Sequence, residues 1–307
     1  MRGIILTEID LSGYDFGEIK VERINTKTIS GFEGNKDVIS IVGCRATANK
    51  ILNMDFPSLK LYQLTSAGFD TIPVNKFSEK GIWLCNAGDV YSTPIAETVV
   101  YGILKYVKRF WKSPKKNFLR PMRGYKYIDE LAGKKILIMG CGRIGTAVAK
   151  RIVAFDADVC GYDRFPVNKP EYSDIYTSRE QLIKNISKFD YIVTTIPLLE
   201  NTRGFMDAEL FSAMKCSAII VNVARQAIFN DSDLYRALKN KTIGGAVLDM
   251  FEKIPNPITN KYRRLSNVLV LPGVSAISIP VKQRLVGHVA KNLNLLINGE
   301  QPLFCVN

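Results

Sequence analysis

The chain has 307 residues, of which 47% are hydrophobic, and its formal net charge is +13. This length and apolar content suit two compact domains and exclude a largely disordered protein. No apolar run approaches the ~20 residues of a membrane-spanning helix. The opening residues turn acidic too early for a signal peptide, so we expect a cytoplasmic protein without a membrane partner.

The first part of the chain alternates apolar runs of strand length with a stretch of helical spacing at residues 48–54. The predicted strands are residues 2–7, 38–42 and 59–64. Alternation of this kind is typical of a parallel sheet. A long helix is predicted to follow, with Thr93 as its N-cap and Pro94 at its first position.

A glycine-rich turn, GCGRIG at residues 140–145, is the most informative segment of the sequence. An apolar run of strand length precedes it at 134–139, and a stretch with helical apolar spacing follows at 146–155. The order strand, glycine turn and helix predicts a dinucleotide-binding turn, which a GxGxxG motif alone would indicate only weakly.

Each glycine of this turn has a specific role in the prediction. Gly140 permits the tight turn, Gly142 lets the backbone approach a pyrophosphate, and Gly145 lets the helix pack closely on the strand. Arg143 and Ile144 begin the helix, whose free N–H groups and positive dipole end favour phosphate.

An acidic residue ends the next predicted strand, residues 158–162, about 20 residues after the glycine turn. This residue, Asp163, is expected to accept hydrogen bonds from the ribose hydroxyls of the cofactor. Its charge would repel a 2′-phosphate, so the sequence favours NAD over NADP.

Strand and helix patterns then alternate to the end of the chain. The predicted strands are residues 191–196, 218–223, 245–249 and 268–271. An amphipathic helix is predicted over 280–297, and Asn298-Gly299 forms its stop signal. Repeated β–α units after a glycine turn predict an α/β fold with a doubly wound parallel (Rossmann) sheet.

Because the dinucleotide-binding pattern starts in mid-chain, the sequence predicts two domains. A separate domain is expected at residues 1–93 and an NAD-binding Rossmann domain at 94–273. The last segment, 274–307, is expected to form a helix that returns to the first of these domains.

The six cysteines include no CxxC pair, and His288 is the only histidine. Dispersed cysteines in apolar surroundings usually serve as small core residues. A metal site has almost no ligands here, so we expect no bound metal.

Cations are concentrated at residues 105–126, a stretch that contains no acid and is interleaved with aromatic residues. An acidic partner such as nucleic acid is one interpretation, and a solvated helix and loop is the other. No nucleic-acid-binding motif accompanies the charge, so we expect no nucleic-acid partner.

Taken together, the motifs resemble those of the D-isomer-specific 2-hydroxyacid dehydrogenases, the family of phosphoglycerate and formate dehydrogenases. The resemblance spans nearly the whole chain. It is carried by the segments Ser66–Asp70, Gly81–Asn86, Thr93–Glu97, Gly140–Gly145, Ile196–Leu198 with Thr202, Asn222–Arg225 and Leu248–Phe251.

The resemblance implies that residues 1–93 form a flavodoxin-like substrate (catalytic) domain, and it implies a set of site residues. Arg225 is expected to anchor the substrate carboxylate and to polarise the neighbouring carbonyl, which suits its planar, permanently charged side chain. Backbone N–H groups near Ala67 and Gly68 are expected to complete the carboxylate site.

The resemblance also implies cofactor contacts and an assembly. Pro197, Thr202 and Val223 are expected to border the cofactor, and Asp249 to contact the nicotinamide amide. A homodimer formed through the cofactor domain is expected as well.

The sequence departs from the family at two positions of its proton relay. Gly273 stands where the family has its catalytic histidine, and Ile254 where it has the glutamate partner. Glu252, Lys282 and water are the alternative proton sources. Loss of a general acid typically costs about 10²–10⁴ in rate.

The sequence therefore predicts an NAD-dependent oxidoreductase acting on a small 2-keto or 2-hydroxy acid, more effective in reduction than in oxidation. The apolar Ile254 and the small Gly273 predict a roomier pocket that accepts bulkier substrates. The alternative is a catalytically impaired NAD(H)-binding protein of the same fold that acts as a sensor or partner.

Overall fold

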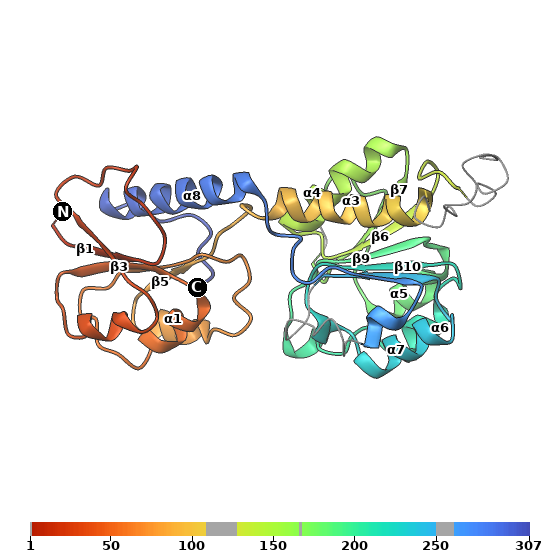
Figure 1. Cartoon of the computed structure of the whole chain (residues 1–307), viewed down its shortest axis with the longest axis horizontal. Helices are drawn as coiled ribbons and strands as arrows, with labels where there is room; N and C mark the ends of the chain where they lie inside the picture. Colours follow the sequence, from red (N-terminus) through yellow and green to blue (C-terminus); the bar gives the residue numbers. More distant parts are fainter. Residues whose placement is uncertain (1, 109–127, 166–167, 250–260) are drawn as a thin grey trace. The chain divides into compact units, whose positions relative to one another are not determined.

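The computed structural model describes residues 2–108, 128–165, 168–249 and 261–307. The chain divides into two compact units. Unit 1 comprises Met1–Tyr91 and Ile277–Asn307, and unit 2 comprises Ser92–Ala276. The chain thus begins in unit 1, passes through unit 2 and returns (Figure 1). Within the described ranges, no helix is both long and apolar enough to cross a membrane.

Unit 1 is built on a sheet of strand order β2-β1-β3-β4-β5. All its strand pairs are parallel, which confirms the parallel sheet predicted for this part of the chain. The strands are β1 (Ile4–Thr7), β2 (Lys20–Arg23), β3 (Val38–Gly43), β4 (Leu61–Leu64) and β5 (Trp83–Cys85).

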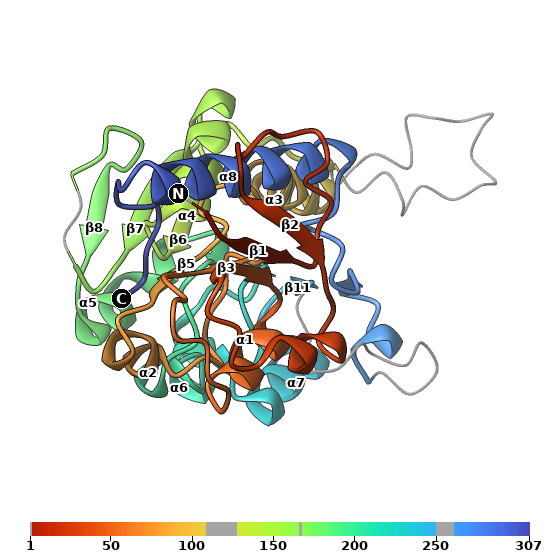
Figure 2. The ribbon, with the colours of Figure 1, turned by 90° about the vertical axis from the view of Figure 1, so that its left-hand side faces the viewer.

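Helices cover both faces of the unit 1 sheet (Figure 2). One face carries α1 (Arg45–Ile51) and α2 (Val74–Glu79), and the other carries α8 (Ile279–Ile297). Successive strand residues point to opposite faces, so Leu6 joins the core under α1 and α2 while Ile5 joins the core under α8.

Unit 2 is built on a larger parallel sheet, of strand order β12-β11-β10-β9-β6-β7-β8. Its strands are β6 (Lys135–Met139), β7 (Asp158–Tyr162), β8 (Asp174–Tyr176), β9 (Tyr191–Thr194), β10 (Ile219–Asn222), β11 (Gly245–Leu248) and β12 (Val268–Val270). The chain runs outward from β6 to β8 and then crosses back to β9, next to β6. This reversal of strand order confirms the predicted doubly wound sheet, and ligands of such sheets bind at the carboxyl ends of the strands at this point.

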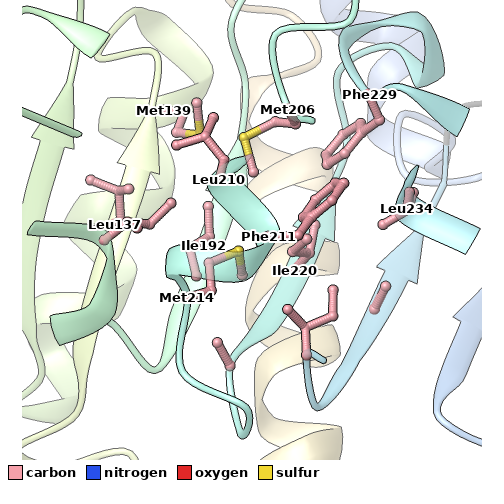
Figure 3. Close-up of a cluster of buried hydrophobic side chains, with 14 of the residues drawn as sticks. Leu137, Met139, Ile192, Met206, Leu210, Phe211, Met214, Ile220, Phe229 and Leu234 are labelled. Atoms are coloured by element: carbon pink, nitrogen blue, oxygen red, sulfur yellow. The ribbon is translucent and has the colours of Figure 1, made fainter. Parts of the chain in front are cut away.

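Helices lie on both faces of this sheet as well. One face carries α3 (Ser92–Lys108) and α4 (Arg143–Ile152), and the other carries α5 (Arg179–Asn185), α6 (Ala208–Ala213) and α7 (Asp231–Lys239) (Figure 1). The core beneath α6 contains Met139, Ile192 and Ile220 from the strands (Figure 3). There the rings of Phe211 and Phe229 stack with centroids 6.4 Å apart. Burial of this apolar surface is the main source of stability for unit 2.

Helix α3 begins at Ser92, so the prediction of Thr93 as its N-cap is wrong. The N–H groups of the first helical turn have no partner within the helix, so a proline is tolerated at any position there. Pro94 can therefore be the third residue of a helix that begins at Ser92. Tyr106 anchors α3 on the sheet, since its hydroxyl donates to the carbonyl of Ala246 at 2.9 Å or to that of Asn267 at 2.7 Å.

The C-terminal tail (Leu303–Asn307) lies along β5, the edge strand of the unit 1 sheet. Val306 N donates to the carbonyl of Leu84 at 2.8 Å. A disulfide joins Cys85 to Cys305. No sequence pattern predicts this bond, although Cys85 is a buried core residue as expected and Cys305 packs against the same core. Cys141 and Cys160 are buried and free.

Candidate functional site

In the glycine turn between β6 and α4, two of the three glycines are packed too tightly to carry a side chain. Gly140 has φ +101°, and a Cβ there would lie 2.8 Å from the backbone nitrogen of Ile196, just after β9. A Cβ on Gly145 would overlap the carbonyl oxygen of Gly140. These two glycines are required by the fold of the apo chain.

Gly142 differs from both, because a Cβ placed on it would meet no atom within 4 Å. It is the N-cap of α4, with extended backbone and no side-chain cap bond. Arg143 and Ile144 form the first turn of this helix. An open backbone at the positive end of an uncapped helix fits the pyrophosphate of a dinucleotide.

Asp163 follows β7 and is bonded to the glycine turn. Its Oδ2 accepts a hydrogen bond from Cys141 N at 2.8 Å, and its Oδ1 accepts one from Phe165 N at 3.1 Å. Each carboxylate oxygen retains lone-pair capacity for a ribose hydroxyl. The Asp163 side chain thus lies next to the turn, as its role in the prediction requires.

Lys169 also reaches the glycine turn, although no sequence pattern predicts this contact. Its Nζ lies 2.6 Å from the carbonyl oxygen of Cys141 and 2.7 Å from Oγ1 of Thr146 in α4. The ammonium group therefore adds positive charge beside the first turn of α4. No motif identifies Lys169, because it lies in the connection from β7 to β8, whose path is set by the fold.

The Cys141 side chain is buried beneath the same turn. Burial raises the pKa of the Cys141 thiol to about 11. The thiol is therefore neutral at physiological pH and serves as a packing group.

Pro197 and Thr202 belong to a single turn that follows β9. Thr202 Oγ1 donates to the carbonyl of Pro197 at 2.7 Å, and Leu199 N donates to Thr202 Oγ1 at 2.7 Å. Thr195, just before this turn, lies 2.8 Å through its Oγ1 from the carbonyl of Gly140. The Thr202 hydroxyl thus holds the turn, and the turn borders the glycine segment through Thr195.

Arg225 comes from the segment that follows β10. Asn222 is buried, and its Oδ1 accepts from Thr194 Oγ1 at 2.8 Å and from Ala224 N at 3.1 Å, which fixes the path of Val223. Arg225 Nη1 donates to the carbonyl of Ala224 at 3.1 Å. The half-buried guanidinium thus belongs to the carboxyl edge that also carries the glycine turn.

Asp249 follows β11 and is completely buried. Its Oδ1 accepts from Val274 N at 2.8 Å and from Ser275 N at 3.2 Å, and its Oδ2 accepts from the Ser275 hydroxyl. In the structure, Asp249 therefore holds the Gly273–Ser275 turn.

Gly273 starts this turn with φ +71°, and a Cβ there would meet nothing within 4 Å. The space is open, but the left-handed backbone disfavours any side chain. The position thus suits glycine better than a larger residue.

In unit 1, Ala67 and Gly68 follow β4 in a half-exposed loop. Ser66 Oγ donates to the carbonyl of Gly68 at 2.9 Å. Within the described part of the chain, neither the Ala67 nor the Gly68 amide donates to a protein acceptor. Two backbone donors in one loop are suited to a carboxylate.

The other predicted residues fall elsewhere. Lys282 is exposed on α8 in unit 1. Glu252 and Ile254 lie outside the described residues, as does most of the basic stretch 105–126. Within the described residues there is no cluster of three or more metal-ligating side chains.

Comparison with known proteins decides the family. Residues 100–275 match the family model of the D-isomer specific 2-hydroxyacid dehydrogenase, NAD binding domain. The chain belongs to this family. The glyoxylate reductase of Thermofilum pendens is 31% identical over 259 residues, 82% of this chain and 76% of that protein. Glyoxylate/hydroxypyruvate reductase A of Arabidopsis thaliana is 29% identical, over 86% and 84% of the two chains.

Solved structures share the two-domain fold. The holo form of D-mandelate dehydrogenase from Rhodotorula graminis superposes with a TM-score of 0.84 at 18% identity, covering 100% of this chain and 98% of that one. An NADPH-dependent glyoxylate/hydroxypyruvate reductase from Sinorhizobium meliloti, in complex with NADP and malonate, gives 0.79 at 23% identity, covering 100% and 97%.

Proposed function

We propose that the chain is an NAD-dependent reductase of small 2-keto acids that uses Arg225 as its carboxylate anchor. The observation that carries this proposal is the open Gly142 at the uncapped end of α4, on the same sheet edge as Arg225. The names of the relatives point to glyoxylate and hydroxypyruvate as the first substrates to test.

The cofactor is proposed to lie across the carboxyl edge of the unit 2 sheet. Gly142, Arg143 and Ile144 receive its pyrophosphate, and Asp163 accepts hydrogen bonds from its ribose. The negative charge of Asp163 opposes a 2′-phosphate, which supports NAD as the cofactor. The Sinorhizobium relative takes NADP, so both cofactors must be tested.

The Arg225 guanidinium in unit 2 is proposed to bind the carboxylate of the 2-keto acid. Within unit 1, the Ala67 and Gly68 amides are proposed as carboxylate donors. A bound nicotinamide would supply the hydride that reduces the 2-keto carbon. Arg225 polarises the carbonyl and stabilises the negative charge that develops on its oxygen. Orientation of the two reactants by these groups contributes to the rate without any proton transfer.

A proton source other than histidine is proposed, on the inference from the motif spacing that Gly273 stands at the position of the family histidine and Ile254 at that of its glutamate partner. The open space above Gly273 admits water as the donor. Glu252 and Lys282 are the other candidates. Reduction needs a proton that water can give, whereas oxidation needs a base, so reduction is the favoured direction.

The test is oxidation of NADH and NADPH by the purified protein with glyoxylate, hydroxypyruvate and an aromatic 2-keto acid. Arg225→Ala should lose turnover by about 10²-fold or more, since an electrostatic stabiliser of this kind typically contributes that much. Arg236→Ala is the control, since Arg236 is an exposed arginine on α7 that pairs with Asp233. Turnover that is equal in wild type and Arg225→Ala contradicts the proposal.

The second candidate is an NAD(H)-binding sensor or partner protein without significant catalysis. The left-handed backbone of Gly273 favours it, since the position is adapted to lack a side chain. Tight NADH binding without turnover of any 2-keto acid would support this candidate. The homodimer and the cytoplasmic location remain predictions.

A further inference from the structure

The loop that carries Ala67 and Gly68 is held by the segment that follows β5. Asn86 Nδ2 donates to the carbonyl of Ala67 at 3.0 Å, and Ala87 N donates to the carbonyl of Ser66 at 3.0 Å. These bonds join the loop after β4 to the residues after the neighbouring strand.

Asn86 is 5% exposed, and every polar group it has is hydrogen-bonded. Its backbone N donates to the carbonyl of Phe304 at 3.1 Å, and its Oδ1 accepts from Gly88 N at 2.9 Å. Its backbone carbonyl accepts from Gln63 Nε2 at 3.0 Å and from His288 Nε2 at 3.0 Å. The side-chain amide is therefore fixed in one orientation.

Helix α8 and the C-terminal tail support Asn86 from behind. Asn292 Nδ2 lies 2.7 Å from Gln63 Oε1, and Asn292 Oδ1 accepts from Leu303 N at 2.8 Å. The Phe304 ring fills the space beside Gly88, where a Cβ would approach the ring to 2.6 Å.

The carbonyl of Ala67 and the N–H of Gly68 belong to one planar peptide group and point in opposite directions. A hydrogen bond to the carbonyl therefore sets the direction of the N–H. We propose that Asn86 is a positioning residue that aims the Gly68 N–H at the substrate carboxylate. The proposal rests on the carboxylate site of the proposed function, and Asn86 itself touches no substrate in it.

The variant Asn86→Asp tests the proposal with little change in shape. It keeps the acceptor for Gly88 N and replaces the donor to Ala67 by an oxygen that repels the carbonyl. Asn307→Asp is the matched control, because Asn307 Nδ2 donates to the Ile82 carbonyl at 2.7 Å and Oδ1 accepts from Leu84 N at 2.8 Å. Both asparagines thus make the same pair of bonds, at the two ends of β5.

Steady-state kinetics should separate the two variants. Asn86→Asp should raise the KM for the 2-keto acid about tenfold, because the misdirected Gly68 N–H loses its charge-assisted hydrogen bond to the substrate carboxylate. Its kcat and its Kd for NADH should remain close to those of the wild type. Asn307→Asp should leave KM unchanged. An equal rise of KM in both variants would overturn the proposal.

Hydrogen–deuterium exchange tests the positioning itself without any turnover. The amide of Ala87, which donates to the Ser66 carbonyl, should exchange about tenfold faster in Asn86→Asp than in Asn307→Asp. Equal exchange in the two variants refutes the role of Asn86, whatever the activity. Faster exchange in a protein that reduces no 2-keto acid keeps the role of Asn86 and rejects the proposed function. If Asn86→Asp does not fold, the uncharged Asn86→Ser takes its place in both experiments.

Discussion

Replacement of Gly142 by alanine tests whether the turn between β6 and α4 receives the cofactor. Gly142 has φ −73° and ψ −158°, which alanine adopts without strain. A methyl group there would meet no protein atom within 4 Å. The substitution should therefore leave the apo protein intact and occupy the space that the proposal assigns to the pyrophosphate.

Two opposing effects on stability nearly cancel. Alanine restricts the unfolded chain and so stabilises the protein by about 0.4–1 kcal/mol. Loss of glycine from the N-cap destabilises α4 by a similar ~0.5–1 kcal/mol. The Tm should thus change by less than about 2 °C. The Kd for NADH should rise at least about tenfold, which corresponds to 1.4 kcal/mol of lost binding.

NADH fluorescence titration measures the Kd, and thermal unfolding of the same samples measures the Tm. Gly13→Ala is the control, since Gly13 is also open and has no positive φ. Gly145→Ala is the contrast, because its Cβ overlaps Gly140 and should cost about 1–3 kcal/mol of stability. The reasoning is refuted if Gly142→Ala binds NADH as the wild type does, or if it loses as much stability as Gly145→Ala.

Three further predictions concern other contacts. Lys169→Ala should raise the Kd for NADH about fivefold through loss of two charged hydrogen bonds, whereas Lys150→Ala should not; equal values would reject this role of Lys169. Burial raises the pKa of the Asp207 carboxyl, but hydrogen bonds from Arg179 and the Leu210 amide outweigh it and hold this pKa below its usual value. The stabilisation is therefore present above the unfolded pKa of about 3.9 and is lost as pH falls through the lower folded value, so urea unfolding of Asp207→Asn between about pH 5 and 2 should show a shallower pH dependence than wild type. Cys305→Ser should lower the free energy of unfolding by about 2–4 kcal/mol in non-reducing buffer and only slightly in a buffer that contains a dithiol. Cys216→Ser, at an exposed free cysteine, should leave the free energy of unfolding unchanged in both buffers.

The sequence predicts unit 2 well because its central strands are continuous apolar runs bounded by turns. β6, β9, β10 and β11 are buried on both faces, and such strands need no alternation to be recognised. The short edge strands β2 and β8 escape prediction, since β2 is largely exposed and polar and β8 has only three residues.

The candidate site is predictable where a residue type and its spacing carry the chemistry, as for the glycine turn, Asp163 and Arg225. The parts of the site that depend on contacts between residues far apart in the sequence cannot be predicted in this way. Lys169 reaches the turn from a loop, Asn86 depends on a helix some 200 positions later, and Cys85 pairs with Cys305 across 220 residues. No local pattern encodes such contacts.

The C-terminal tail along β5 has a consequence for self-association. An uncovered edge strand offers unpaired N–H and carbonyl groups to another chain, which invites aggregation. Here the backbone of Phe304 and Val306 occupies those groups, and the disulfide ties the covering segment to the strand. A chain that ends before Leu303 would therefore expose an aggregation-prone edge strand and would also be less stable. Reduction of the disulfide would weaken the attachment of the tail that covers this edge.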